Sequence, residues 1–338
     1  MQVAAILITG LTLAYANGAN DNFKGVATLF GSGTPDRRRA LLWATGTTLI
    51  GSLCAIWLAE ELLKQFSGKG IVSDALASDP GFATAVAMGA GLTVLLATRL
   101  GMPISTTHSL VGALTGTALA SSTAVQWSTV TNKLMIPLLL SPFIALVGTT
   151  LLYPLFRKSR IALGLTKQSC FCAGVETIET VPQLTPELTV ARIETLSASL
   201  GTAVTCRERY DGRVVGVDGA AALDTGHYLS AGLMSFARGL NDTPKIAALF
   251  LVAPYMTPLG ALALCGGAIA IGGLISSRRV AETMSHRITT MNAGQGFTAS
   301  LITTVTVIVA SRLSLPAACR CRCQPRMSPA VHCLAWER

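Results

Sequence analysis

The chain has 338 residues, of which 51% are hydrophobic and only 13% are charged, and its mean hydropathy is +0.54. About a quarter of the residues in an ordinary soluble domain are charged, so the composition excludes that class of protein. The formal net charge of +9 comes from short Lys and Arg clusters between apolar runs. This distribution is typical of membrane topology and argues against a nucleic-acid partner.

Long uncharged runs recur along the chain and predict membrane helices. About 20 apolar residues are needed to cross a hydrocarbon core of roughly 30 Å. In chain order, we expect helices near residues 3–30, 39–63, 81–98, 104–120, 133–156, 227–251, 256–277 and 288–311. No basic residue precedes the first run, so we interpret it as a retained span in place of a signal peptide. For 104–120, a re-entrant hairpin is the alternative to a crossing. The expected fold is an all-α polytopic membrane protein in contact with the lipid bilayer.

The stretch 157–226 is rich in charged residues and Thr and cannot lie in lipid. We expect a loop or a small aqueous insert. Its cysteines, Cys170, Cys172 and Cys206, have no His nearby and match no usual zinc site. They are therefore expected to be free thiols.

Three basic clusters, at residues 37–39, 157–160 and 278–287, predict the orientation. The positive-inside rule places such clusters in the cytoplasm, and the crossings counted above allow all three to face it. We therefore expect a multi-pass protein of the cell (inner) membrane, with its N-terminus outside and its central loop cytoplasmic.

An internal repeat relates the two halves of the chain. Residues 14–24 pair with residues 235–245 at an offset of 221, and residues 98–103 pair with 311–316 at an offset of 213. Five predicted crossings separate the two copies, and an odd number implies opposite orientation. An inverted repeat of transmembrane helices with broken or re-entrant segments is typical of secondary transporters. We assign 1–156 to the first membrane repeat, 157–226 to the cytoplasmic loop and 227–316 to the second repeat.

Each copy of the repeat carries an Asn-Asp pair followed by a Lys inside an apolar segment. These residues are Asn20, Asp21 and Lys24, and Asn241, Asp242 and Lys245. An ionisable group within the membrane indicates a functional site. Gly18 is expected to let the first helix break and expose backbone N–H groups that suit an anion. Each Asp would then bind a cation or accept a proton, although simple Asp–Lys ion pairs are the alternative.

Three consecutive hydroxyl residues, Ser105, Thr106 and Thr107, follow Pro103 at the expected start of a helix. Their hydroxyls and free N–H groups can replace the water around a tetrahedral oxyanion, or they can bond to carbonyl groups within the helix. A membrane-embedded hydrolase using Ser105, His108 and Asp21 is an alternative of another class. Nucleophilic catalysis needs neither three adjacent hydroxyls nor a duplicated Asn-Asp, so we do not expect an enzyme.

Taken together, these motifs resemble the PiT family of inorganic phosphate transporters. The resemblance implies an inverted-repeat fold, phosphate as substrate and a sodium ion or a proton as the driving ion, with no other cofactor and no resident metal. The residues that it implies as phosphate contacts are Asn20, Asp21, Ser105, Thr106, Thr107, Asn241 and Asp242, with both Asp residues also near the cation. Some animal relatives carry Glu at the positions of Thr48 and Ser300. We expect a cation-coupled phosphate symporter, with a sulfate or other oxyanion carrier of the same fold as the alternative, and leave open whether it is a homo-oligomer.

The C-terminus departs from this pattern. A second Ser-Thr-Thr-His segment is expected after Pro316, but residues 317–324 contain three Cys and two Arg. A Cys-x-Cys-x-Cys metal site is the alternative, although its spacing matches no usual zinc site. The abrupt change in composition predicts a frameshift or truncation, which would make 317–338 an aberrant tail and leave the second repeat incomplete.

Overall fold

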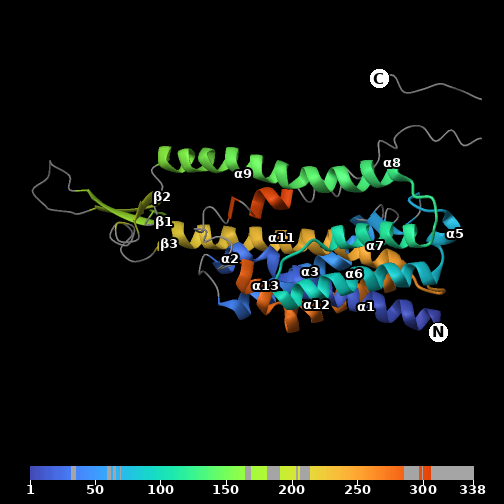
Figure 1. The fold of residues 1–338 in the computed structure, drawn as a ribbon. Helices are drawn as coiled ribbons and strands as arrows, with labels where there is room; N and C mark the ends of the chain where they lie inside the picture. Colours follow the sequence, from blue (N-terminus) through green and yellow to red (C-terminus); the bar gives the residue numbers. More distant parts are fainter. Residues whose placement is uncertain are drawn as a thin grey trace, which may run out of the picture.

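The computed structural model describes residues 1–31, 36–58, 62–63, 66–68, 70–163, 169–180, 191–202, 205, 214–284, 297–298 and 300–305. Long helices lie side by side in an elongated bundle, and a small sheet lies beyond one end of it (Figure 1). The helical elements are α1 (Gln2–Asp21), η1 (Asn22–Gly25), α2 (Ala27–Gly31), α3 (Arg37–Leu58), α5 (Asp74–Ala77), α6 (Pro80–Leu100), α7 (Thr106–Ala120), α8 (Trp127–Thr129), η2 (Val130–Met135), α9 (Ile136–Ala162), α11 (Gly219–Phe250), α12 (Pro258–Ser276) and α13 (Arg278–Glu282).

Five helical stretches of the described chain are long and apolar enough to cross a membrane: Gln2–Gly25, Arg37–Trp57, Pro80–Leu100, Trp127–Ala162 and Pro258–Ser276. The prediction of a polytopic membrane protein is confirmed. The 32-residue α11 is not among these stretches and carries the charged residues Arg238, Asp242 and Lys245. The predicted helix at 288–311 lies mostly outside the described residues, of which 300–305 are helical, and the tail 317–338 lies wholly outside them.

The segment predicted as helix 104–120 forms the second arm of a hairpin. Gly101, in the left-handed region with φ of 73°, ends α6, and the Ser105 side chain caps α7. With 15 residues, α7 is about 22 Å long at 1.5 Å per residue, which is shorter than a hydrocarbon core. Beyond α7, the Gln126 amide donates to the Ile71 carbonyl over 2.8 Å, so the chain returns to the segment that precedes α6. These dimensions favour the re-entrant alternative.

Four glycines lie where the two halves pack most closely, at the crossings of α1 with α12 and of α3 with α11. A Cβ at Gly18 of α1 would lie 1.9 Å from the Ile269 carbonyl oxygen of α12, and one at Gly239 of α11 would lie 2.1 Å from the Thr48 carbonyl oxygen of α3. The offset of 221 relates Gly18 to Gly239, and it also relates Thr48 to Ile269. The crossings α1–α12 and α3–α11 are therefore equivalent contacts.

The reciprocal glycines of these crossings, Gly51 and Gly272, are related by the same offset of 221. A Cβ at Gly272 would lie 2.0 Å from the Tyr15 carbonyl oxygen, and one at Gly51 would lie 2.1 Å from the Phe236 carbonyl oxygen. In Figure 1, α1 runs from the N-terminal end of the bundle toward α2, whereas α11 runs in the opposite direction, away from β3.

The expected break at Gly18 is wrong, because α1 remains helical through Gly18 to Asp21. Gly18 is needed for the close approach of α12, since any side chain there would meet the Ile269 backbone. The break comes later, where η1 adopts a 3-10 helix at Asn22–Gly25. The second copy has no such break among the described residues, because α11 continues past Pro244 to Phe250.

The polar stretch forms a three-stranded antiparallel sheet that the sequence did not predict. Strands β1 (Ser169–Thr180), β2 (Ala191–Thr202) and β3 (Val214–Asp218) are ordered β2-β1-β3. Cys170 pairs with Gly201 and with Asp218. Cys170 is a free thiol, whereas Cys172 is disulfide-bonded, which corrects the expectation for Cys172.

Candidate functional site

Asn20 connects the end of α1 to the turn between α6 and α7. Its side-chain Nδ2 donates to Thr98 Oγ1 over 3.0 Å and to the Met102 carbonyl over 2.9 Å, and its Oδ1 accepts from the Ile104 amide over 3.0 Å. Asn20 is fully buried. Because the amide is occupied at both ends, Asn20 positions the turn in this structure.

Asp21 is the centre of a buried polar cluster. Its Oδ2 accepts from Asn17 Nδ2 and from Thr106 Oγ1, each over 3.1 Å, and Asn17 Nδ2 also donates to Thr106 Oγ1 over 2.9 Å. Lys24 forms an ion pair with Asp21 Oδ1 and donates to the Ile104 carbonyl. A charge in this position is tolerated because it is paired and hydrogen-bonded.

The second copy forms a similar pair on α11. Lys245 Nζ lies 3.3 Å from Asp242 Oδ1, which also accepts from Asn241 Nδ2 over 3.1 Å. Lys245 reaches across to α7, where its Nζ donates to Thr107 Oγ1 over 2.8 Å. Both Asp–Lys ion pairs considered from the sequence are therefore present.

The three hydroxyl residues have different partners. Ser105 is exposed, and its Oγ accepts from the His108 amide over 3.3 Å as the N-cap of α7. Thr106 contacts Asp21 of the first copy, and Thr107 contacts Lys245 of the second. The start of α7 therefore lies between the two Asp-Lys motifs, and its first turn has backbone N–H groups without partners inside the helix.

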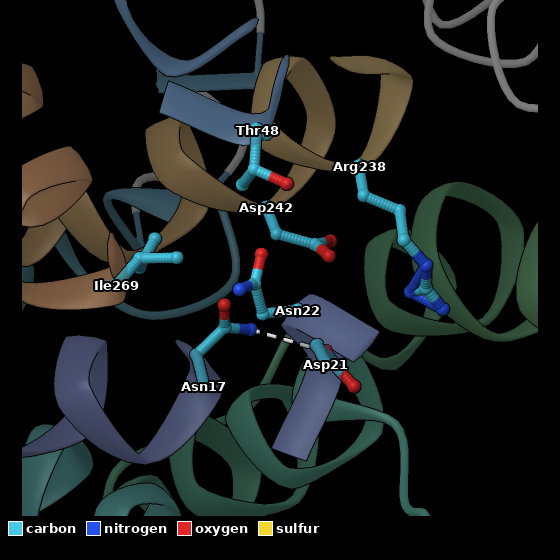
Figure 2. Close-up of a pocket in the computed structure, with 8 residues that line it drawn as sticks. Asn17, Asp21, Asn22, Thr48, Arg238, Asp242 and Ile269 are labelled. Carbon is cyan, nitrogen blue, oxygen red and sulfur yellow. Dashed lines mark hydrogen bonds between the residues drawn. The ribbon is translucent and has the colours of Figure 1, made fainter. Parts of the chain in front are cut away.

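A small cavity lies between the two copies (Figure 2). Its lining comprises Asn17, Asp21, Asn22, Thr48, Arg238, Gly239, Asp242 and Ile269. Three pairs in this lining are related by the offset of 221: Asn17 and Arg238, Asp21 and Asp242, and Thr48 and Ile269. Both Asp residues of the duplicated motif therefore reach the same cavity.

Sequence reasoning assigned no role to Asn17, Asn22 or Arg238. Asn22 Nδ2 donates to Thr45 Oγ1 over 2.8 Å, whereas its buried Oδ1 has no partner. The repeat contains the signal that was missed, because Asn17 and Arg238 occupy equivalent positions one residue before the crossing glycines.

A transported cation would find oxygen ligands here, which hard cations prefer. The cavity is lined by Asp21, Asp242, Thr48 and Asn22, and the buried Oδ1 of Asn22 has no partner. Among the described residues, no group of three or more His, Cys, Asp and Glu side chains lies together.

The residues of the alternative hydrolase do not form a triad in this arrangement. Ser105 bonds to the backbone amide of His108, and the Asp21 carboxylate bonds to Asn17, Lys24 and Thr106. A nucleophile, a base and an orienting acid need to be joined by hydrogen bonds between their side chains.

Comparisons with known proteins show the family of the chain. Residues 17–319 match the sequence profile of the phosphate transporter family. A protein of Pyrococcus abyssi described as a phosphate permease is 24% identical over 348 residues, covering 92% of this chain and 84% of the relative. The chloroplastic inorganic phosphate transporter 2-1 of Arabidopsis thaliana is 26% identical over 374 residues, covering 92% of this chain and 62% of the relative.

A solved structure titled the sodium-dependent phosphate transporter has the same fold, with a TM-score of 0.66 and 20% identity over 93% of this chain and 85% of that one. The family match spans both copies of the Asn-Asp motif and the hydroxyl segment, and the chain belongs to the phosphate transporter family.

Proposed function

We propose that this chain is a cation-coupled symporter of inorganic phosphate. The observation that carries the proposal is that two Asp-x-x-Lys motifs, related by the offset of 221, both contact the first turn of α7. The Asp residues of both motifs also line one cavity. Carboxylates suit a cation, while ammonium groups, hydroxyls and a helix start suit an oxyanion. A site of this composition can bind both.

Charge supplies the reason for coupling. Moving one elementary charge across a membrane potential takes about 2.3 kcal/mol per 100 mV. Phosphate carries one or two negative charges near neutral pH and enters against an inside-negative potential. A co-transported sodium ion or proton offsets this energy, and Asp21 and Asp242 are the groups that we assign to it. The sodium-dependent structural neighbour supports sodium.

We assign phosphate contacts to Asn20, Asp21, Ser105, Thr106, Thr107, Asn241 and Asp242. In the described state, Asn20 and Ser105 have structural hydrogen bonds, so their contact with phosphate requires a rearrangement, whereas Thr106 and Thr107 already adjoin both motifs. A protonated phosphate can donate a P–OH hydrogen bond to an Asp carboxylate, which sulfate cannot do. This difference favours phosphate over a sulfate carrier of the same fold.

We also propose that the two halves form an inverted repeat. Support comes from the equivalent glycine crossings at the offset of 221 and from the opposite directions of α1 and α11 in Figure 1. The hairpin of α6 and α7 leaves the predicted orientation unchanged, because two crossings and one hairpin both return the chain to the same side.

The basic ends of the helices support a cytoplasmic central sheet. The start of α3, the end of α9 and the start of α13 carry the three basic clusters. These ends and the sheet lie at the same end of the bundle (Figure 1). The disulfide at Cys172 is unusual for a reducing compartment, whereas three separate basic clusters favour the cytoplasmic side.

Uptake of labelled phosphate into proteoliposomes tests the proposal. We expect uptake under an inward sodium or proton gradient and at least a tenfold loss in Asp21→Asn and in Asp242→Asn. The proposal fails if the purified, folded chain moves no phosphate under either gradient. A second version, in which residues after Pro316 are replaced by another Ser-Thr-Thr-His segment, tests the expectation that the second repeat is incomplete.

A further inference from the structure

One pair of cavity residues that the repeat relates differs in charge. Asn17 precedes Gly18, and Arg238 precedes Gly239. Both glycines lie against a backbone carbonyl of the crossing helix, which fixes α1 and α11 in the same way. Asn17 and Arg238 therefore project from equivalent places, and both line the cavity.

Asn17 has a structural role that Arg238 does not reproduce. The Asn17 amide bridges Asp21 and Thr106. The equivalent carboxylate in the second half, Asp242, bonds instead to Asn241 and Lys245. Arg238 makes no ion pair with any residue that the structure describes, and its buried Nε has no hydrogen-bond partner. Figure 2 shows its side chain extending along one side of the cavity, past the Asp242 carboxylate.

Among the described residues around the cavity, one positive charge has no negative partner. Asp21 and Asp242 are each paired with a lysine of their own motif, which leaves the guanidinium of Arg238. A guanidinium is always ionised and presents a planar set of donors that matches an oxyanion. Within a membrane, such a charge needs a counter-ion.

We propose that Arg238 is the charge-selecting group of the site, and that it binds the doubly charged form of the tetrahedral oxyanion. This inference rests on the proposed function and goes beyond it by naming the ionic form of the substrate and the residue that recognises it. The lysines neutralise the carboxylates. Arg238 and one co-transported cation then supply two positive charges, which the doubly charged substrate neutralises.

The test compares Arg238→Asn, which gives the second half the residue of the first, with Arg238→Lys, which keeps the charge but loses the planar donors. Arg160→Asn, in the exposed last turn of α9, is the matched control for loss of a positive charge. The readouts are the KM for phosphate uptake in proteoliposomes and the rise in melting temperature of the detergent-purified chain with inorganic phosphate, each at mildly acidic and mildly alkaline pH.

For the wild type, we expect tighter phosphate binding at alkaline pH, where the doubly charged form dominates. In Arg238→Asn, the KM at alkaline pH should rise about 10- to 100-fold, as expected for loss of a charged hydrogen bond, and the preference for alkaline pH should disappear. Arg238→Lys should keep the preference with a smaller rise in KM, and Arg160→Asn should match the wild type. If Arg238→Asn does not fold, as judged by its melting temperature without phosphate, Arg238→Gln carries the same expectation.

Two negative results have different meanings. A wild-type chain that shows neither uptake nor stabilisation by phosphate overturns the proposed function. A wild type that transports phosphate, together with a neutral variant at position 238 that keeps the wild-type KM and pH profile, overturns only the role of Arg238.

Discussion

Substitution of Gly18 by Ala tests the packing that brings the two halves together. In a helix, Ala is ordinarily more stabilising than Gly by about 0.5–1 kcal/mol. At Gly18, however, a Cβ would lie 1.9 Å from the Ile269 carbonyl oxygen, whereas ordinary contact begins at 3.4 Å. The helices would have to separate by the difference between these two distances, because the obstacle is backbone and cannot rotate away. Overpacking of this kind lowers stability by about 1–3 kcal/mol.

The same shift should disturb the site. Ile269, whose carbonyl oxygen is the obstacle, lines the cavity together with Asp21 of α1. Separation of α1 from α12 therefore moves two walls of the cavity apart. We therefore expect Gly18→Ala to lower the melting temperature of the purified chain and to reduce phosphate uptake at least tenfold, and Gly239→Ala, at the equivalent crossing, to do the same.

Gly46→Ala is the matched control, because a Cβ at Gly46 on α3 would meet nothing within 4 Å. It should melt at or above the wild-type temperature and retain uptake. The packing argument is refuted if Gly18→Ala and Gly239→Ala melt at or above the wild-type temperature, as the control does.

Three further predictions concern the site and the orientation. Thr106→Val removes a donor to Asp21 and should raise the KM for phosphate about tenfold. Ser105→Ala should lower stability by about 1 kcal/mol as a lost N-cap and raise the KM less than Thr106→Val does, because Ser105 reaches phosphate only after a rearrangement. A larger rise in the KM in Ser105→Ala than in Thr106→Val would contradict the assignment of these hydroxyls. Lys245→Met leaves the Asp242 carboxylate without its cation and should lower the free energy of unfolding by about 3 kcal/mol. The Asp242→Asn/Lys245→Met double variant should recover part of this stability. Equal melting temperatures for the wild type and Lys245→Met would rule out a stabilising ion pair. Leu196→Cys places a thiol at an exposed position of β2. In inside-out vesicles only, this variant should react with a membrane-impermeant maleimide more than the wild type does. The same excess reaction in right-side-out vesicles would reverse the proposed orientation.

Local patterns in the chain were enough to predict its membrane character and the residues of the duplicated motif. Apolar length can be counted in any window, because a span requires only enough consecutive residues without charge. The predicted helix near 81–98 became α6 at Pro80–Leu100, and the one near 256–277 became α12 at Pro258–Ser276. The offset of 221 between the motifs also predicted that Asp21 and Asp242 have related positions.

The contacts between these elements depended on how the helices pack. Thr106 and Thr107 are adjacent in the chain, but helix geometry turns them toward different partners, Asp21 and Lys245. Gly18 suggested a break when read along the chain, and its real constraint is the Ile269 backbone in the other half of the molecule. The same holds for Arg238: its charge is visible in the sequence, but its place in the cavity lining depends on how α11 packs against the other helices. Such contacts join residues distant in the chain, so no local periodicity encodes them, and they arise only when both halves fold around one cavity.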